Sequence, residues 1–425
     1  MSRAEKIRVA AILAAGYALF LAYAAPGFMS IDSAQQLLQA RAHSYDNWHP
    51  PAMAWLWGIV EHVVRGPLPM LLLQSGTLFA GIFLILHRVF TPTRAAIIAC
   101  LIFLFPVVIA PMAVIWKDSQ MAGYLLLGFA LLFGRFRIAG LVLLALGCAM
   151  RHNAPAAALP LLFVIDWGGR RLTRVAIIAG LFVAITGSAT LLNKHLTDRT
   201  AYPWHTALAP FDIGGVMKYG RAFRDDEMLR ILDGTPLVPH DHIAATARRI
   251  YSPTNWWPLL NGSDRLFNWP ENPTQRAAIE RAWKELVWNN KRAYLHHRIA
   301  TFIATLGLDG EPLFAPLWYG EPNDEYKHAL DLEAPAEHRV AIGKALEWLA
   351  VHTVLFRPYL YFFLAIIGLV LARKQLDLVA LYASGLIYEL TLLPFGSADV
   401  RYSHWLVVTM MLATVILVRR RMTRA

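Results

Sequence analysis

Charged side chains of both signs stand where the long apolar runs of this sequence end. Asp32 comes a few residues after the first run, and Lys117-Asp118, Arg151 and Arg401 lie at the ends of later runs. A carboxylate within reach of a hydroxyl can act as a general base, and an arginine can bond two phosphate oxygens at once. These residue types suit transfer of a group from a lipid-anchored phosphate. Asp32 would be the base, and Arg151, Arg401 and Lys117 would hold the departing phosphate.

Five short polar clusters share this position at the ends of apolar runs: Asp32, Trp48-His49-Pro50-Pro51, Trp116-Lys117-Asp118-Ser119, Arg151-His152-Asn153 and Asp399-Val400-Arg401-Tyr402. Helices packed in a bundle can bring such ends together although they are far apart in sequence. The catalytic candidates are Asp32 and Asp118. The substrate-binding candidates are His49, Lys117, Arg151, Asn153, Asp399, Arg401 and Tyr402. Asp118 can also hold a divalent cation, Mg²⁺ or Mn²⁺, on the phosphate, and no other metal or cofactor is indicated.

Structural roles are the alternatives for several of these residues. Asp118 can cap a helix that begins at Ser119, and Asp399 can form a salt bridge with Arg401 that closes a span. His49, next to two prolines, is also typical of a packed or capping residue. The outer ends carry acids as well as bases, whereas the inner ends carry mainly Arg and Lys. This difference favours a joint functional role.

The composition is that of a membrane protein. Of the 425 residues, 57% are hydrophobic and 16% are charged, and the mean hydropathy is +0.42; soluble domains have about 45–50% apolar and about 25% charged residues. The net charge of +11 does not indicate nucleic acid as a partner, because Lys and Arg collect in cytoplasmic loops for reasons of insertion. Cys100 and Cys148 fall inside apolar runs and are expected to be core residues.

The apolar runs predict an all-α, polytopic fold with about ten transmembrane helices, since a span needs roughly 20 apolar residues or somewhat fewer. The expected spans are 9–27, 68–87, 95–114, 119–134, 138–150, 154–166, 175–192, 352–372, 376–394 and 403–418. Residues 49–64 are too short to span and are expected to form a helix in the outer interface. If they did span, every later orientation would invert.

Basic residues predict the orientation of the chain by the positive-inside rule. With the N-terminus in the cytoplasm, each short basic loop falls inside, and both termini are cytoplasmic. These loops contain Arg88 and Arg94; Arg135 and Arg137; Arg170, Arg171 and Arg174; Arg373 and Lys374; and Arg419, Arg420, Arg421 and Arg424. The expected location is a bacterial inner membrane, with the polar clusters on the periplasmic side. The alternative for the first run is a signal peptide cleaved after Ala22-Tyr23-Ala24.

Three regions are expected along the chain. Residues 1–192 form an N-terminal transmembrane module whose first outer loop, 28–67, is catalytic. Residues 193–351 are rich in Trp, Asn, Asp, Pro and His and form a mainly helical periplasmic region, with helix over 274–308. Residues 352–425 supply the C-terminal transmembrane helices. The aromatic residues of 251–257 and 283–294 can stack on sugar rings, but a hydrophobic core is the simpler role for them.

The order of these motifs resembles the GT-C superfamily of integral-membrane glycosyltransferases, in particular bacterial relatives of protein O-mannosyltransferases and of the lipid A aminoarabinose transferase. The resemblance is carried by Asp32 early in the first outer loop, His49-Pro50-Pro51 closing that loop, Asp118 in the second, and Asp399-Val400-Arg401-Tyr402 before the final span. It covers about 1–170 and 350–425. Ser33 follows Asp32, so the paired acids of some members are absent here.

The resemblance implies a polyprenyl-phosphate or polyprenyl-diphosphate sugar as donor and action on the outer face. It assigns the catalytic base to Asp32, a second acidic role to Asp118, and the lipid phosphate to basic residues near the ends of spans. The acceptor is a glycan, lipid or protein. The alternatives are a polysaccharide polymerase or ligase, and a transporter or flippase for a lipid-linked sugar. Transporters place polar groups near the bilayer midplane and often have paired halves, whereas these polar residues cluster on one face.

Overall fold

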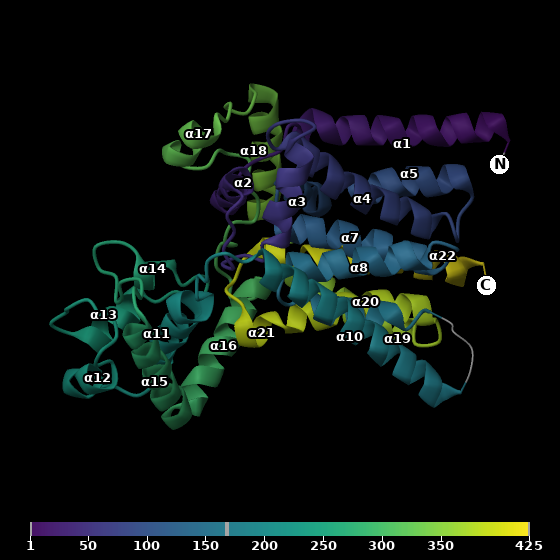
Figure 1. Cartoon of the computed structure of the whole chain (residues 1–425). Helices are drawn as coiled ribbons and strands as arrows, with labels where there is room; N and C mark the ends of the chain where they lie inside the picture. Colours follow the sequence, from purple (N-terminus) through teal and green to yellow (C-terminus); the bar gives the residue numbers. More distant parts are fainter. Residues whose placement is uncertain (1, 166–169, 424–425) are drawn as a thin grey trace. The chain divides into compact units, whose positions relative to one another are not determined.

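The structure, a computed structural model, describes residues 2–165 and 170–423 (Figure 1). All of its regular elements in these ranges are helices, with only isolated β-bridges beside them. The described chain divides into two compact units. Unit 1 contains residues up to 200 together with 315–390 and those from 400 onwards, and unit 2 contains 201–314 and 391–399. The predicted all-α class is therefore confirmed.

Unit 1 is a helical bundle with shorter helices at one end. Figure 1 shows the start of α1 and the end of α22 at one end of this bundle, and α2, α3, α17 and α18 at the other. Its helices are α1 Arg3–Ala24, α2 Ile31–Ala42, α3 Ala52–Glu61, α4 Leu68–Leu86, α5 Pro92–Phe103, α6 Pro106–Met112, α7 Lys117–Leu132, α8 Arg137–Met150, α9 Ala154–Leu162, α10 Arg171–Leu196, α17 Asp324–Leu330, α18 Glu337–His352, α19 Pro358–Leu371, α20 Leu376–Leu390, the 3₁₀ turn η2 Val400–Ser403 and α22 His404–Met422.

Five helical stretches in the described residues are long and apolar enough to cross a membrane: Arg3–Ala24, Leu68–Leu86, Arg171–Leu196, Leu376–Phe395 and Val400–Met422. A sixth results if α5 and α6, which meet at a bend of 70°, count as one span. The polytopic membrane character is thus confirmed. The count by length is lower than the ten spans expected, because α7, α8, α9 and α19 are shorter than a full span.

A proline accounts for the interrupted span. The expected span 95–114 breaks at Phe105, whose backbone is extended because the residue before a proline is disfavoured in the α conformation. The expected break between 138–150 and 154–166 is present: α8 ends at Met150, the extended Arg151 follows it, and α9 begins with Pro155 in its first turn. The last residue of the expected span 154–166 lies outside the described residues.

Helices α7 and α8 cross where two glycines meet. A methyl group added to Gly128 would lie 2.9 Å from the carbonyl oxygen of Gly140, and one added to Gly140 would lie 2.8 Å from that of Gly128. Small residues at such crossings let backbones approach closely inside membranes. The crossing therefore fixes the separation of α7 and α8, the two helices whose ends carry Asp118 and Arg151.

Enlarging either glycine should separate these helices. We expect Gly128→Ala and Gly140→Ala to lower the free energy of unfolding by about 1–3 kcal/mol, the range for overpacking a close contact. Gly180→Ala in α10 is the matched control, because no atom lies within 4 Å of its added methyl group. Thermal unfolding of the three variants in detergent measures the difference. Equal midpoints for all three would contradict a tight α7–α8 crossing.

Unit 2 is shorter than the region 193–351 that the sequence predicts, and it is discontinuous. Residues 315–351 belong to unit 1, because their side chains bond to its helices: Arg339 donates to the carbonyls of Tyr23 and Ala24, and Tyr326 accepts from Gln35. Unit 2 gains 391–399 instead. Arg298 donates to the Gly396 carbonyl at 3.0 Å, and the Ala398 amide donates to the Thr254 carbonyl at 2.8 Å.

Unit 2 is built around a buried polar network. Its helices are the π-helical turn η1 Trp204–Leu208, α11 Ala209–Tyr219, α12 Asp225–Ile231, α13 Ile243–Ile250, α14 Trp257–Leu260, α15 Pro273–Asn289, α16 Lys291–Leu306 and α21 Leu392–Phe395. The Asp212 carboxylate accepts from Trp283 at 2.7 Å and His297 at 3.1 Å, and it pairs with Arg298. Tyr251 lies 2.7 Å from the other ring nitrogen of His297.

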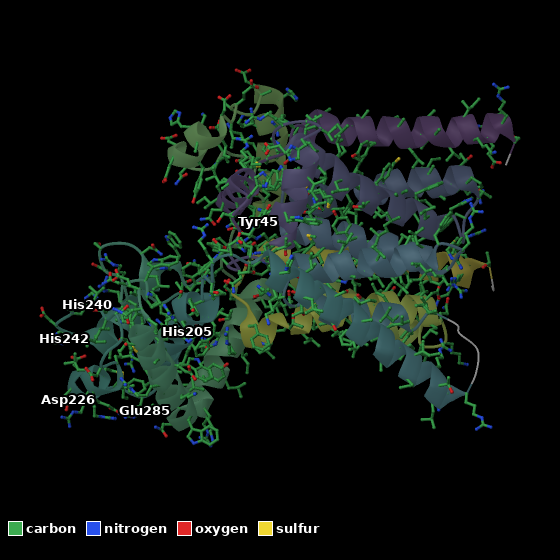
Figure 2. All side chains as sticks on the ribbon, viewed as in Figure 1. Tyr45, His205, Asp226, His240, His242 and Glu285 are labelled. Atoms are coloured by element: carbon green, nitrogen blue, oxygen red, sulfur yellow. The ribbon has the colours of Figure 1, made fainter. Side chains whose placement is uncertain are left out.

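Most of the aromatic residues singled out from the sequence serve this core. Tyr251 is part of it, and Trp256, Trp283 and Tyr294 pack against it. Trp257 and Trp288 are instead exposed. The helix expected over 274–308 is present as α15 and α16, which are separated at Asn290. At the surface of unit 2, Asp226 and Glu285, labelled in Figure 2, pair with Arg224 and Arg230. Such exposed pairs contribute about 0–1 kcal/mol each.

Candidate active site

Asp32 lies in the first turn of α2, and local bonds fix the start of that helix. Ser30 and Ser33 form a capping box in which each side chain bonds to the other's backbone amide. A carboxylate in the first turn is favoured by the partial positive charge of a helix N-terminus. The Asp32 side chain is 27% exposed. The sequence therefore places this acid at a helix start where its charged form is stabilised.

The start of α2 is bonded to the segment that precedes α7. The Phe28 amide donates to the Ala113 carbonyl, and the Phe28 carbonyl accepts from the Ile115 amide. Ser33 donates to the Ile115 carbonyl at 2.7 Å, and the Trp116 indole donates to Ser30 at 2.9 Å. These bonds hold Asp32 beside Lys117, although 85 positions separate them in the sequence.

His49 links Asp32 to Lys117. Its Nδ1 contacts the Lys117 ammonium, which can only donate, so Nδ1 accepts and the neutral ring carries its proton on Nε2. That Nε2 lies 3.6 Å from Asp32 Oδ1. The loop that carries His49 is held at Tyr45, labelled in Figure 2, whose carbonyl accepts from the amides of Asp198 and Arg199. His49 is therefore oriented toward the carboxylate.

Arg401 is the closest charged partner of Asp32. It stands in η2, and its guanidinium lies 2.7 Å from Asp32 Oδ2. Burial raises the pKa of Asp32, but the charges of Arg401, His49 and Lys117 outweigh it and hold the pKa well below its usual range. Asp32 is thus ionised at neutral pH. The same pairing makes it a weaker base than a free carboxylate.

Asp118 and Arg151 form a second ion pair, which is more deeply buried. Asp118 is 2% exposed in the first turn of α7, and Arg151, at the end of α8, is 11% exposed. Breaking such a pair by removing one partner costs about 3–5 kcal/mol, because the remaining charge is left buried. The alternative that Asp118 caps a helix starting at Ser119 is wrong. The helix starts at Lys117 and its N-cap residue is Trp116.

Tyr402 joins the two ion pairs. The Arg151 guanidinium lies 4.3 Å from the centre of the Tyr402 ring, and that of Arg401 lies 5.4 Å from it. Arg401 also lies 4.9 Å from the ring of Trp116. Contacts of this kind favour the charged guanidinium over an aromatic face. Seven of the predicted site residues are therefore connected in one network: Asp32, His49, Lys117, Asp118, Arg151, Arg401 and Tyr402.

The two remaining predicted residues have other surroundings. Asn153 occupies the N-cap position of α9 without a side-chain bond to that helix. Asp399 is buried and belongs to unit 2. Arg401 pairs with Asp32, and its salt bridge with Asp399 stays a prediction.

The arrangement around Asp118 does not fit a divalent cation. Its carboxylate is paired with a guanidinium, which competes for the same oxygens and repels a second positive charge. Within the described residues, no group of three or more His, Cys, Asp or Glu side chains could hold a metal ion. The chemistry considered below therefore uses no step through a metal.

Sequence reasoning missed Glu389 and the contribution of Trp116. Glu389 is fully buried in α20 and accepts from Ser403 at 2.7 Å, just after the Arg401-Tyr402 pair. An acid inside an apolar run was the available signal, because ionisable residues in spans are costly and usually functional. Trp116 contributes through its indole bond to Ser30 and its ring beneath Arg401. No sequence pattern distinguishes a tryptophan with this role from the other tryptophans of the chain.

A cavity of about 480 Å³ opens beside the second ion pair. Arg151 and His152 line it together with the C-terminal part of α10, which contributes Thr186, Thr190 and Lys194. α10 is a candidate span with little of its surface buried in the protein. The cavity therefore lies between a charged residue of the network and the C-terminal part of a candidate span.

His49 should give the protein a measurable acid sensitivity. Burial and the charge of Lys117 lower its pKa despite the opposing effect of Asp32, so the folded protein resists protonation. The unfolded chain takes up this proton near pH 6.5. The free energy of unfolding should therefore fall as the pH drops below about 6.5 and level off above it. We expect His49→Gln to reduce this fall.

Thermal midpoints between pH 7.5 and 5 measure the effect of His49. His242→Gln, at an exposed histidine labelled in Figure 2, is the matched control variant. Parallel profiles for wild type and His49→Gln would show that His49 is not held neutral.

Comparison with known proteins gives one distant structural likeness. No protein-family model matches the chain, and no curated protein matches it. Among solved structures, the chain is similar to the crystal structure of ArnT from Cupriavidus metallidurans bound to undecaprenyl phosphate. The sequence identity is 14%, the match covers 98% of this chain and 78% of that chain, and the TM-score is 0.36. The function of this chain is therefore argued from its own residues.

Proposed function

We propose that this membrane protein is a glycosyltransferase that moves a sugar from a polyprenyl-phosphate donor to an acceptor. The observation that carries the proposal is the network in which Asp32 and Asp118 each pair with an arginine beside Lys117. It combines a base with cations that can bond phosphate oxygens. The sequence resemblance to GT-C enzymes supports the same assignment. We further propose a bacterial inner membrane location, cytoplasmic termini and a periplasmic site.

The proposed reaction is a single displacement at the anomeric carbon. Asp32 accepts the proton of the acceptor hydroxyl while that oxygen bonds to the anomeric carbon. The bond from this carbon to the donor phosphate oxygen breaks, and the phosphate leaves with the bonding electrons. Arg401, Arg151 and Lys117 stabilise the charge that develops on it. Attack opposite the leaving group inverts the anomeric configuration.

The test uses purified protein with radiolabelled polyprenyl-phosphate sugars, with and without EDTA. Sugar released to water or to a membrane extract measures turnover. Turnover by the wild type would support a transferase, and the EDTA arm decides whether a divalent cation takes part. Binding without turnover, across several sugars and acceptors, would argue against the proposal and favour transport of a lipid-linked sugar.

A further inference from the structure

Both acids of the network occupy the arginines that a donor phosphate needs. Arg401 lies 2.7 Å from Asp32 Oδ2, and Arg151 is paired with the 2%-exposed Asp118. A carboxylate and a phosphate present similar oxygens to a guanidinium. A phosphate can therefore form two hydrogen bonds with either guanidinium only if the carboxylate moves away from it.

The two arginines are close enough to bind one phosphate. Both lie against the Tyr402 ring, at 4.3 Å and 5.4 Å from its centre, so their guanidinium carbons are less than about 10 Å apart. Two guanidiniums that bind one phosphate from opposite sides have their carbon atoms at a similar separation. The shared aromatic face can hold both cations in place while their anionic partner changes.

We propose that Asp32 and Asp118 occupy the places of donor phosphate oxygens at Arg401 and Arg151, and that a bound phosphate displaces both carboxylates. This inference rests on the proposed function, because the anion is taken to be a lipid-linked phosphate. Displacement separates Asp32 from its arginine only when donor is present. Asp32 therefore becomes available to the acceptor only after the donor has bound, so the donor binds first and the acceptor second.

The low pKa of Asp32 agrees with this order. Burial alone raises that pKa, and the charge of Arg401 is the largest effect that lowers it. When Arg401 turns to the phosphate, Asp32 loses this partner and its proton affinity rises. A carboxylate beside a bound phosphate also experiences like-charge repulsion, which raises its pKa further. Donor binding thus turns a weak base into a stronger one.

Removing either carboxylate should make phosphate binding tighter, although it removes polar groups from the site. We expect Asp32→Asn and Asp118→Asn to bind polyprenyl phosphate roughly tenfold more tightly than wild type, a change of about 1.4 kcal/mol. Arg401→Gln and Arg151→Gln should bind it more weakly. A purely structural role for the two acids would leave affinity unchanged or reduce it.

The measurement is a titration of the full chain in lipid nanodiscs with undecaprenyl phosphate, in EDTA and again with Mg²⁺. Undecaprenol, which lacks the phosphate, reports the contribution of the lipid tail. Its affinity should be the same for wild type and all variants. Asp377→Asn is the matched control, because Asp377 forms a comparable ion pair with Arg420 at 2.6 Å outside the network. Its affinity for undecaprenyl phosphate should equal that of wild type.

The outcomes separate this inference from the proposed function. Tighter binding by both asparagine variants in EDTA supports displacement. Wild-type binding with no gain in either asparagine variant overturns the inference and leaves the proposed function standing. If the asparagine variants bind undecaprenyl phosphate more weakly than wild type only when Mg²⁺ is present, the inference is also overturned. The acids would then act through a cation. If no form binds undecaprenyl phosphate, both the inference and the proposed function fail.

Discussion

Asp32→Asn is expected to lower the rate of sugar transfer by about 10²–10⁴-fold, the usual contribution of a general base. The asparagine keeps the size of the side chain and can still accept from Arg401, but it cannot take the acceptor proton. Transfer from a radiolabelled polyprenyl-phosphate sugar measures the loss. Far-UV circular dichroism and membrane insertion should be unchanged.

The control for this variant is Asp226→Asn, which removes an exposed carboxylate paired with Arg224 in unit 2. Its activity should match wild type. A fully active Asp32→Asn protein would exclude Asp32 as the base. Equal losses in the two variants would show that the assay reports general damage.

Arg151→Gln should destabilise the protein by about 3–5 kcal/mol, because it leaves the Asp118 carboxylate buried without its partner. Adding Asp118→Asn removes that charge, so the double variant should recover most of the lost stability. Transfer activity should stay low in both, because the guanidinium that holds the leaving phosphate is gone from both. Thermal unfolding in detergent and the transfer assay measure the two effects separately.

The comparison between the single and double variants decides the role of this ion pair. A double variant no more stable than Arg151→Gln would show that Arg151 stabilises the bundle through its Tyr402 contact and not through Asp118. Recovery of both stability and transfer would remove Arg151 from the proposed phosphate site.

The charged ends of the apolar runs were sufficient to predict most of the network. Asp32, Lys117 and Arg401 could be recognised because a charge next to an apolar run is costly and limits where the chain can go. The pairing between them could not be predicted. Arg401 was as compatible with its sequence neighbour Asp399 as with Asp32, which lies far away in sequence and is brought close by packing.

Helix ends were harder to predict than helices. Pro106 was visible in the sequence, yet hydropathy averages over about 20 residues and smooths out a break of one or two residues. The cap at Trp116 was missed for a related reason, since Asp118 is a favoured capping residue and tryptophan is not. Tertiary contacts overrode that preference, because Asp118 pairs with Arg151.

The boundary of unit 2 could not be inferred from composition. Residues 315–351 share the polar character of 201–314, and only contacts such as Arg339 with the carbonyls of Tyr23 and Ala24 assign them to unit 1. The return of 391–399 to unit 2 depends on Arg298 and Thr254. Such bonds between residues about 100 or more positions apart leave no local pattern.

The discontinuity of unit 2 limits how this chain can be shortened or recombined. A deletion that joins residue 200 to residue 315 would remove Arg298 and Thr254, the hydrogen-bond partners of Gly396 and Ala398. The backbone just ahead of Arg401 would then lose its attachment. A graft of this unit between homologues must therefore carry 201–314 and 391–399 as a matched set. If only 201–314 were exchanged, residues 391–399, which precede Arg401, would have to pack against a core from another protein.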